Sequence, residues 1–198
     1  MSPFVQSLER NRNVVSESLD PSKGNFAGNT KFLHFDMSSW DEIVEERLVL
    51  SGQCVAGGLA KSDDCAFYAA APVADGKGWE MIWSEEYVQS IEVDVERFED
   101  VPINESSILL HALNEGKAPL GLWLGRSKFK VVQYDADFEI SGKSVVTLFA
   151  TRPKGGVHVV STGTTVIVGI YSEDVGQSSG NCRSSVLKFA EYLLENGY

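Results

Sequence analysis

The sequence predicts an α+β domain of the α/β-sandwich kind, in which helices pack on a central antiparallel sheet. One observation is a series of four apolar, strand-like segments between residues 129 and 171, separated by glycine-containing turns. Consecutive strands that are joined by short turns pair in an antiparallel manner. A second observation is an amphipathic stripe near each end of the region 37–198, which indicates helices that cover a face of the sheet.

The first predicted helix follows a segment without regular structure. Residues 1–36 are rich in Asn, Ser, Gly and Lys and show no sustained hydrophobic period, so we expect a flexible N-terminal extension before a domain over residues 37–198. Ser39 and Glu42 form a capping box that opens a helix reaching about Leu50. The apolar stripe of this helix consists of Trp40, Ile43, Val44 and Leu48.

The next elements are short and apolar. Cys54–Leu59 and Cys65–Ala71 lie on either side of a polar turn and predict a β-hairpin. Pro72–Gly78 has the composition of a loop. The strict alternation of apolar and acidic residues over Ile91–Glu96 predicts a strand with one apolar and one acidic face.

The second half of the chain supplies the rest of the sheet and two helices. Asn104 is expected to cap a helix that ends at Gly116. A closing helix is expected over Asn181–Glu195, because apolar residues recur there at three- and four-residue spacing. The four strands are expected at Phe129–Tyr134, Val145–Thr151, Val157–Ser161 and Thr165–Tyr171.

The negative charge of the chain is concentrated in one segment. The chain has 17 basic and 28 acidic residues, a net charge of −11, which disfavours binding to nucleic acid. Residues 118–198 carry a net charge of +1, whereas Glu80–Asp100 holds eight acids and one base. We name residues 79–101 the acidic insert and expect a projecting hairpin or loop that serves partner selectivity. A simple solvated face is the alternative.

The sequence contains no recognisable catalytic or metal-binding pattern. His34, His111 and His158 are far apart, and none stands in a metal-binding or acid–base motif. The three cysteines do not form a Cys-x-x-Cys pair. Cys182 lies near a predicted helix start, which could lower the pKa of its thiol, but a lone cysteine is more often inert packing. We therefore predict a protein that is not an enzyme and has neither a metal site nor a cofactor.

Aromatic residues mark both terminal helices. Trp40 opens the first helix, and Tyr192 and Tyr198 close the last. If the two helices lie side by side, these rings form a groove that suits a polyproline II ligand. Ordinary packing of the helices on the sheet is the alternative reading of the same spacing.

Several short motifs occur in a fixed order over residues 37–198: Met37–Trp40 at the start of a helix, Ala56–Gly58, Lys128–Val132, Val166–Tyr171 and the C-terminal Phe189–Tyr198. Their order and spacing resemble those of the profilin family. Ile103–Glu105, Lys154–Gly156 and the acidic insert resemble the apicomplexan-parasite branch in particular. The resemblance implies a central antiparallel sheet with the N- and C-terminal helices together on one face and a further helix on the other.

The resemblance also implies a cytoplasmic, monomeric protein of the actin cytoskeleton that binds actin monomers and regulates their polymerisation, by sequestration or by delivery to filament ends. Gln133 stands where many relatives carry arginine, so weak or absent actin binding is the alternative. Phosphoinositide binding is in doubt because of the net charge. The implied actin-binding residues are Lys128, Lys130, Val132, Gly180, Asn181, Arg183, Ser184, Leu187 and Lys188.

A second implied site binds proline-rich segments of formin-type proteins. Two positions depart from the family, since Ile43 replaces a tyrosine and Tyr68 a tryptophan found in many relatives. The groove is therefore expected to be less aromatic, with weak or narrow selectivity among proline-rich peptides. The implied residues are Trp40, Ile43, Tyr68, Tyr192 and Tyr198.

Overall fold

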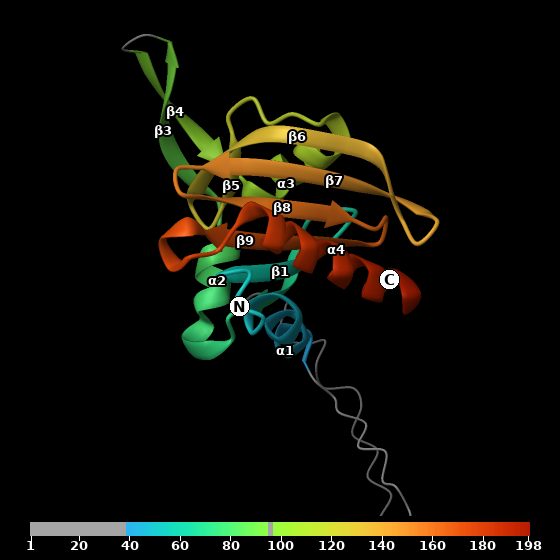
Figure 1. Cartoon of the computed structure of the whole chain (residues 1–198). Helices are drawn as coiled ribbons and strands as arrows, with labels where there is room; N and C mark the ends of the chain where they lie inside the picture. The colour runs from blue at the N-terminus through green and yellow to red at the C-terminus, as the bar shows by residue number, and fades with distance from the viewer. Residues whose placement is uncertain (1–38, 95–96) are drawn as a thin grey trace, which may run out of the picture. The chain divides into compact units, whose positions relative to one another are not determined.

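A computed structural model describes residues 39–94 and 97–198, and the predicted extension over residues 1–36 lies outside the described residues. Seven strands form one antiparallel sheet in the order β2-β1-β9-β8-β7-β6-β5 (Figure 1). Its strands are β1 (Ala56–Lys61), β2 (Phe67–Ala71), β5 (Leu122–Leu124), β6 (Ser127–Ile140), β7 (Lys143–Arg152), β8 (Gly155–Ser161) and β9 (Thr165–Ser172). The predicted α+β fold is confirmed, together with its hairpin and its four C-terminal strands.

The N- and C-terminal helices share one face of the sheet. Helix α1 (Trp40–Val44) continues directly into a π-helical turn, η2 (Glu45–Val49), where the Leu50 amide donates to the carbonyl of Glu45. Helix α4 (Ser179–Glu195) packs on β8 and β9 and contacts η2. The described part of the chain contains no helix long and apolar enough to cross a membrane.

The opposite face carries two helices rather than one. Helix α3 (Glu105–Glu115) begins at the predicted cap, Asn104, and ends at Gly116. Helix α2 (Lys77–Ile82) follows a 3₁₀ turn, η3 (Ala74–Gly76). Much of Pro72–Gly78 is therefore helical, and the loop expected there is wrong. A helix of six residues is too short to show a hydrophobic period, and tertiary contacts with β1 and β2 stabilise it.

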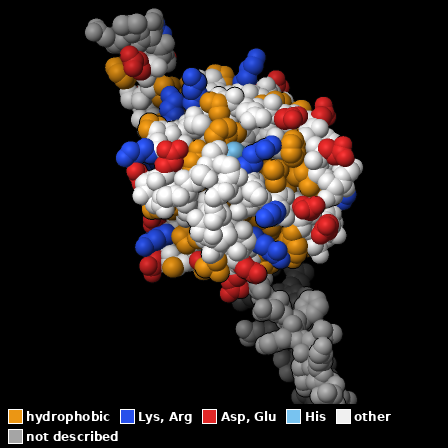
Figure 2. Space-filling view, viewed as in Figure 1, with side chains coloured by type: hydrophobic (Ala, Val, Ile, Leu, Met, Phe, Trp, Pro, Cys, Tyr) orange, Lys and Arg blue, Asp and Glu red, His pale blue; other side chains and the backbone are white. Residues whose placement is uncertain are grey.

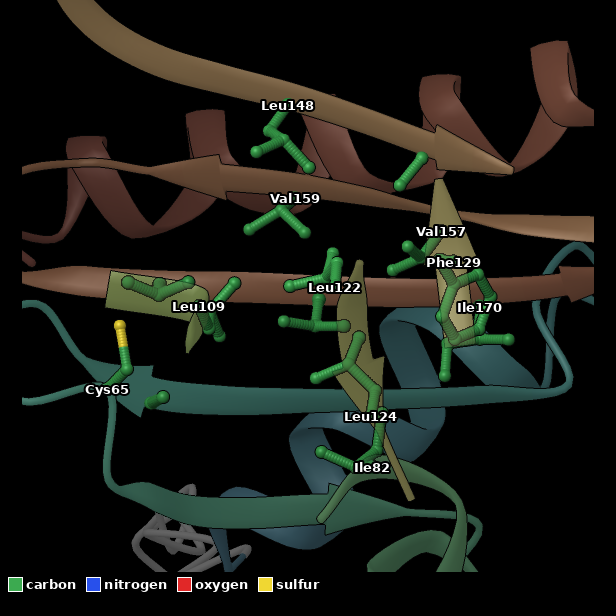
Figure 3. Packing of buried hydrophobic residues seen from close by; sticks show 14 of the residues in the cluster. Cys65, Ile82, Leu109, Leu122, Leu124, Phe129, Leu148, Val157, Val159 and Ile170 are labelled. Atoms are coloured by element: carbon green, nitrogen blue, oxygen red, sulfur yellow. The ribbon is translucent and has the colours of Figure 1, made fainter. Parts of the chain in front are cut away.

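The core under α2 and α3 is built from branched aliphatic side chains of both layers. Figure 3 shows Leu109 of α3 and Ile82 of α2 directed at the same interior as Leu122, Leu124 and Phe129 of the sheet. Residues Leu122–Leu124 form β5, a strand that the sequence did not predict because three residues are too few to show alternation.

The acidic insert is mainly a hairpin that stands apart from the seven-stranded sheet. Strand β3 (Tyr87–Asp94) pairs with β4 (Arg97–Ile103) in a separate two-stranded sheet that projects from the domain (Figure 1). The predicted strand over Ile91–Glu96 is thus part of β3, and residues 95–96 lie outside the described residues. Ile91 is buried against Ile103 and Trp123, while Glu92 is exposed, as the alternation predicts.

Candidate binding surfaces

Three of the rings predicted to form an aromatic groove come together beside α1, the edge strand β2 and the C-terminal end of the chain. The ring of Trp40 stands edge-on to the rings of Tyr198, at 5.0 Å between centroids, and Tyr68, at 6.2 Å. Tyr68 lies on β2, so the three rings come from three separate parts of the chain. All three remain at least partly accessible to solvent. They form a platform of aromatic edges and faces that suits the rings of a polyproline II segment.

Helix α1 is fixed beside this platform by its own acidic side chains. The Ser39–Glu42 capping box is present, with the Ser39 hydroxyl accepting from the Glu42 amide and the Glu42 carboxylate accepting from the Ser39 amide. The carboxylate of Asp41 accepts a hydrogen bond of 2.7 Å from the Ala70 amide on β2. The capping box and this bond to β2 together position Trp40 against the sheet edge.

Tyr192 lies beside the platform but is covered by an arginine that the sequence analysis did not single out. The guanidinium carbon of Arg47, in η2, lies 4.1 Å from the centroid of the Tyr192 ring. Ile43 and Tyr192 are half-buried at the border of the core beneath. Arg47 follows Trp40 by seven residues and Ile43 by four, so helical spacing alone places it on the face of those two residues.

A second surface joins the start of α4 to β6. Ser178 caps α4, and Asn181, Arg183, Ser184 and Lys188 are exposed along it. Gly180 is also exposed, and Leu187 is half-buried. Figure 2, which looks onto the α4 face, shows basic and hydrophobic side chains interspersed there.

A bulge in β6 changes which residues face α4. Pairing with β7 shifts between Val131 and Gln133, so that Gln133 pairs with Phe149 and Lys130 with Thr151. Since residues two apart on β7 point to one face, Gln133 and Lys130 share a face although strict alternation would separate them. Val132, expected on that face, is the extra residue of the bulge and is half exposed, at 50 %. Gln133, Arg183 and Leu187 line one small cavity.

The two predicted lysines of β6 line a different hollow. Lys128, Lys130 and Arg152 border a pocket of about 660 Å³ together with the segment Gly116–Gly121. The ammonium of Lys128 lies 5.7 Å from the Trp123 ring centroid. The structure therefore places the implied actin-binding residues in two groups, one on α4 with Gln133 and one at the β5 edge of the sheet.

His158 is buried beneath the α4 surface. Its ring stacks on Phe149 at 4.4 Å between centroids, and its Nε2 lies 3.0 Å from the Ser179 hydroxyl. Burial and the nearby Arg183 charge lower the pKa of His158 to about 4. A neutral imidazole therefore packs beneath this surface at neutral pH.

Glu105 connects the hairpin to the β5–β6 turn. Its carboxylate is 1 % exposed and accepts from the amides of Ser84, Gly125 and Arg126 at 2.7–3.1 Å. The Tyr87 hydroxyl donates to the same carboxylate at 3.3 Å. Burial raises the pKa of Glu105, and these hydrogen bonds act in the opposite direction. In the sequence, Glu105 stands out only as part of the motif Ile103–Glu105.

The cysteines give no sign of reactivity. All three are buried thiols, and the sulfurs of Cys54 and Cys182 lie 3.3 Å apart. The contact with Cys54 and burial both raise the pKa of the Cys182 thiol, which favours the inert interpretation of this residue. Among residues 39–94 and 97–198, no group of three His, Cys, Asp or Glu side chains is arranged to hold a metal ion.

Comparison with known proteins identifies the family. The profilin family model matches residues 38–198. The profilin of Plasmodium falciparum (isolate 3D7) is 32% identical over 166 residues, which cover 80% of this chain and 96% of that protein. The profilin of Plasmodium berghei is 28% identical over 164 residues, covering 80% and 94%.

Solved structures agree in fold. Schizosaccharomyces pombe profilin superposes with a TM-score of 0.56 at 16% identity, over 81% of this chain and 100% of that one. Acanthamoeba castellanii profilin II gives 0.55 at 18% identity with the same coverage. The predicted resemblance is confirmed: the chain belongs to the profilin family and is of the apicomplexan type.

Proposed function

We propose that this profilin binds monomeric actin through the exposed surface of α4 and β6, as a monomer in the cytoplasm, and thereby controls polymerisation by sequestration or delivery to filament ends. The observation that supports this most is that the cationic Arg183 and Lys188 are exposed on α4 beside the half-buried Leu187, whereas most of the net negative charge lies in the acidic insert. Cationic and apolar groups side by side suit a specific protein interface. No covalent chemistry, metal or cofactor is required.

The aromatic platform of Trp40, Tyr68 and Tyr198 is proposed to hold proline-rich segments of formin-type partners. Three partly accessible rings, with Trp40 at 5.0 Å from Tyr198 and 6.2 Å from Tyr68, offer stacking surfaces at little entropic cost to a preformed polyproline II helix. The platform residues lie in α1, in β2 and after the end of α4, so they share no residue with the α4–β6 surface, and the proposal allows both partners to bind at once.

A partner-binding module with weak or no actin binding is the second candidate. Gln133 favours it, because the bulge in β6 directs this neutral residue onto the face where many relatives carry arginine. The loss of one cation from an interface reduces both the association rate and the attraction to an acidic partner.

Replacing Arg183 by glutamate separates the two candidates. If actin binds the α4–β6 surface, the reversed charge is expected to weaken binding to monomeric actin about tenfold, roughly 1.4 kcal/mol. Affinity is measured by titration into pyrene-labelled actin and by co-elution with actin monomer. The matched control is Lys61→Glu, which reverses an exposed charge on β1. This strand lies four positions away from β6 in the sheet.

Wild-type protein that leaves actin polymerisation unchanged and does not co-elute with the monomer would exclude the first candidate. Equal effects of Arg183→Glu and Lys61→Glu would show instead that only bulk charge matters. Binding of a proline-rich peptide by the same preparations shows that each variant is folded.

The hairpin β3–β4 is proposed to select partners by charge. Halving its net charge with Glu92→Gln and Asp100→Asn, both exposed, is expected to reduce a kinetic preference for basic partners. At low salt, the wild type should associate about two- to threefold faster with a lysine-tailed proline-rich peptide than with a serine-tailed one. The double variant should show a smaller ratio, and high salt should abolish the difference. If the wild type and the double variant associate with the lysine-tailed peptide at the same rate at low salt, the proposal is refuted.

A further inference from the structure

We infer that Arg47 determines the specificity of the aromatic platform, by binding a carboxylate of the ligand next to its prolines. The inference rests on the proposed function of the platform and adds to it the chemistry of the preferred ligand. The preferred segment is a proline-rich peptide with an Asp or Glu residue a few positions from the proline that contacts Trp40.

The stacking of Arg47 leaves its hydrogen-bonding edge free. The guanidinium carbon lies 4.1 Å from the Tyr192 ring centroid, so the planar group lies over the ring. A guanidinium uses its flat face for such stacking, whereas its N–H donors point outward in the plane and match a carboxylate in a bidentate manner. Stacking also restricts the side chain, which reduces the entropy lost on binding.

No acidic side chain of the described residues satisfies those donors. The ion pairs that the described part of the chain forms are Arg97–Glu99 and Lys154–Asp174, and neither involves Arg47. Arg47 is exposed at the surface of η2. A cation that is held in place, accessible and without a carboxylate of the described residues within 4.0 Å is available to a ligand.

Arg47 also limits the aromatic surface that a ligand meets. Because the guanidinium covers one face of Tyr192, that face is closed to a proline ring in the free protein. Ile43, one helical turn before Arg47, offers an aliphatic contact where many relatives have a ring. The ligand therefore passes from a three-ring platform, across an aliphatic side chain, to a charged group.

The spacing of these groups sets the position of the ligand carboxylate. Arg47 stands seven positions after Trp40, and seven positions correspond to a rise of about 10 Å along a helix. A polyproline II helix rises about 3.1 Å per residue. The acidic residue is therefore expected about three positions from the proline on Trp40.

Synthetic proline-rich peptides test this directly. One peptide carries Glu three positions from its central proline, on the N-terminal side, and a second carries it on the C-terminal side, because the direction of the bound peptide is not fixed. Each has a partner peptide with Gln at the same position. In calorimetric titrations at low salt, wild-type protein should bind one Glu peptide about fivefold more tightly than its Gln partner.

Variants identify the residue responsible. Arg47→Gln should reduce that ratio to about one, and Arg47→Lys should restore only part of it, because lysine lacks the bidentate edge. Lys117→Gln removes the same charge from the segment that joins α3 to β5. Because β5 is the sheet edge opposite to β2, this variant should leave the ratio unchanged.

The possible failures are distinguishable. Equal affinity of wild-type protein for all Glu and Gln peptides overturns the role of Arg47 and leaves the platform intact. No binding of any peptide, with Trp40→Ala behaving like the wild type, overturns the proposed platform and the inference with it. A preference that persists in Arg47→Gln assigns carboxylate recognition to another residue.

Discussion

Replacement of Glu105 by alanine is expected to lower the free energy of unfolding by about 3–5 kcal/mol, because it leaves several buried hydrogen-bond donors without an acceptor. The carboxylate of Glu105 is almost fully buried and accepts from three backbone amides and one tyrosine hydroxyl. Alanine leaves these donors without a partner, and each unsatisfied buried donor costs about 1–3 kcal/mol.

Urea unfolding monitored by tryptophan fluorescence measures this loss. Glu105→Gln retains one acceptor oxygen and should recover part of the stability. Glu115→Ala, at the exposed opposite end of α3, is the matched control and should change stability by about 0.5 kcal/mol or less. A loss below about 1 kcal/mol for Glu105→Ala would show that water replaces the carboxylate in this network.

The second large effect is a loss of stability in acid that depends on His158. The native protein holds this imidazole neutral, because burial and Arg183 lower its pKa from 6.5 to about 4. The unfolded chain takes up a proton at His158 below about pH 6.5. Acidification from pH 7 to pH 4 therefore favours the unfolded state, and the difference in pKa corresponds to about 3 kcal/mol.

His158→Phe isolates this contribution. Phenylalanine preserves a flat ring against Phe149 but does not titrate, so the difference in unfolding free energy between wild type and variant should change by about 3 kcal/mol between pH 7 and pH 4. The exposed His111→Phe serves as the control. If the wild type and His158→Phe lose stability in parallel over this range, His158 does not cause the acid sensitivity.

Elements with a strong local signal were predicted accurately. The capping box of Ser39 and Glu42, the helix between Asn104 and Gly116, and the β1–β2 hairpin all occur as predicted. Caps, turns and periodicities are properties of a few consecutive residues, which the sequence displays directly. The aromatic residues at both ends of the domain are likewise visible in the sequence, but their approach, with the ring centroids of Trp40 and Tyr198 5.0 Å apart, is a tertiary contact.

Elements that depend on distant contacts were missed. Helix α2 has six residues and β5 has three, so neither is long enough to show a period. Gly78 of α2 approaches β2 so closely that a Cβ atom at this position would lie 2.4 Å from the Ala71 carbonyl carbon. That requirement for glycine follows from the packing of two segments and has no local signature.

The sequence by itself determined the fold class, the family resemblance, the location of the negative charge and the composition of the aromatic platform. Only the tertiary structure decided that a bulge directs Gln133 toward the α4 face, that Glu105 joins the hairpin to the β5–β6 turn, and that Arg47 covers Tyr192. The reason is physical: propensity and periodicity act between neighbouring residues, whereas strand register, buried hydrogen bonds and stacking join residues that only folding brings together.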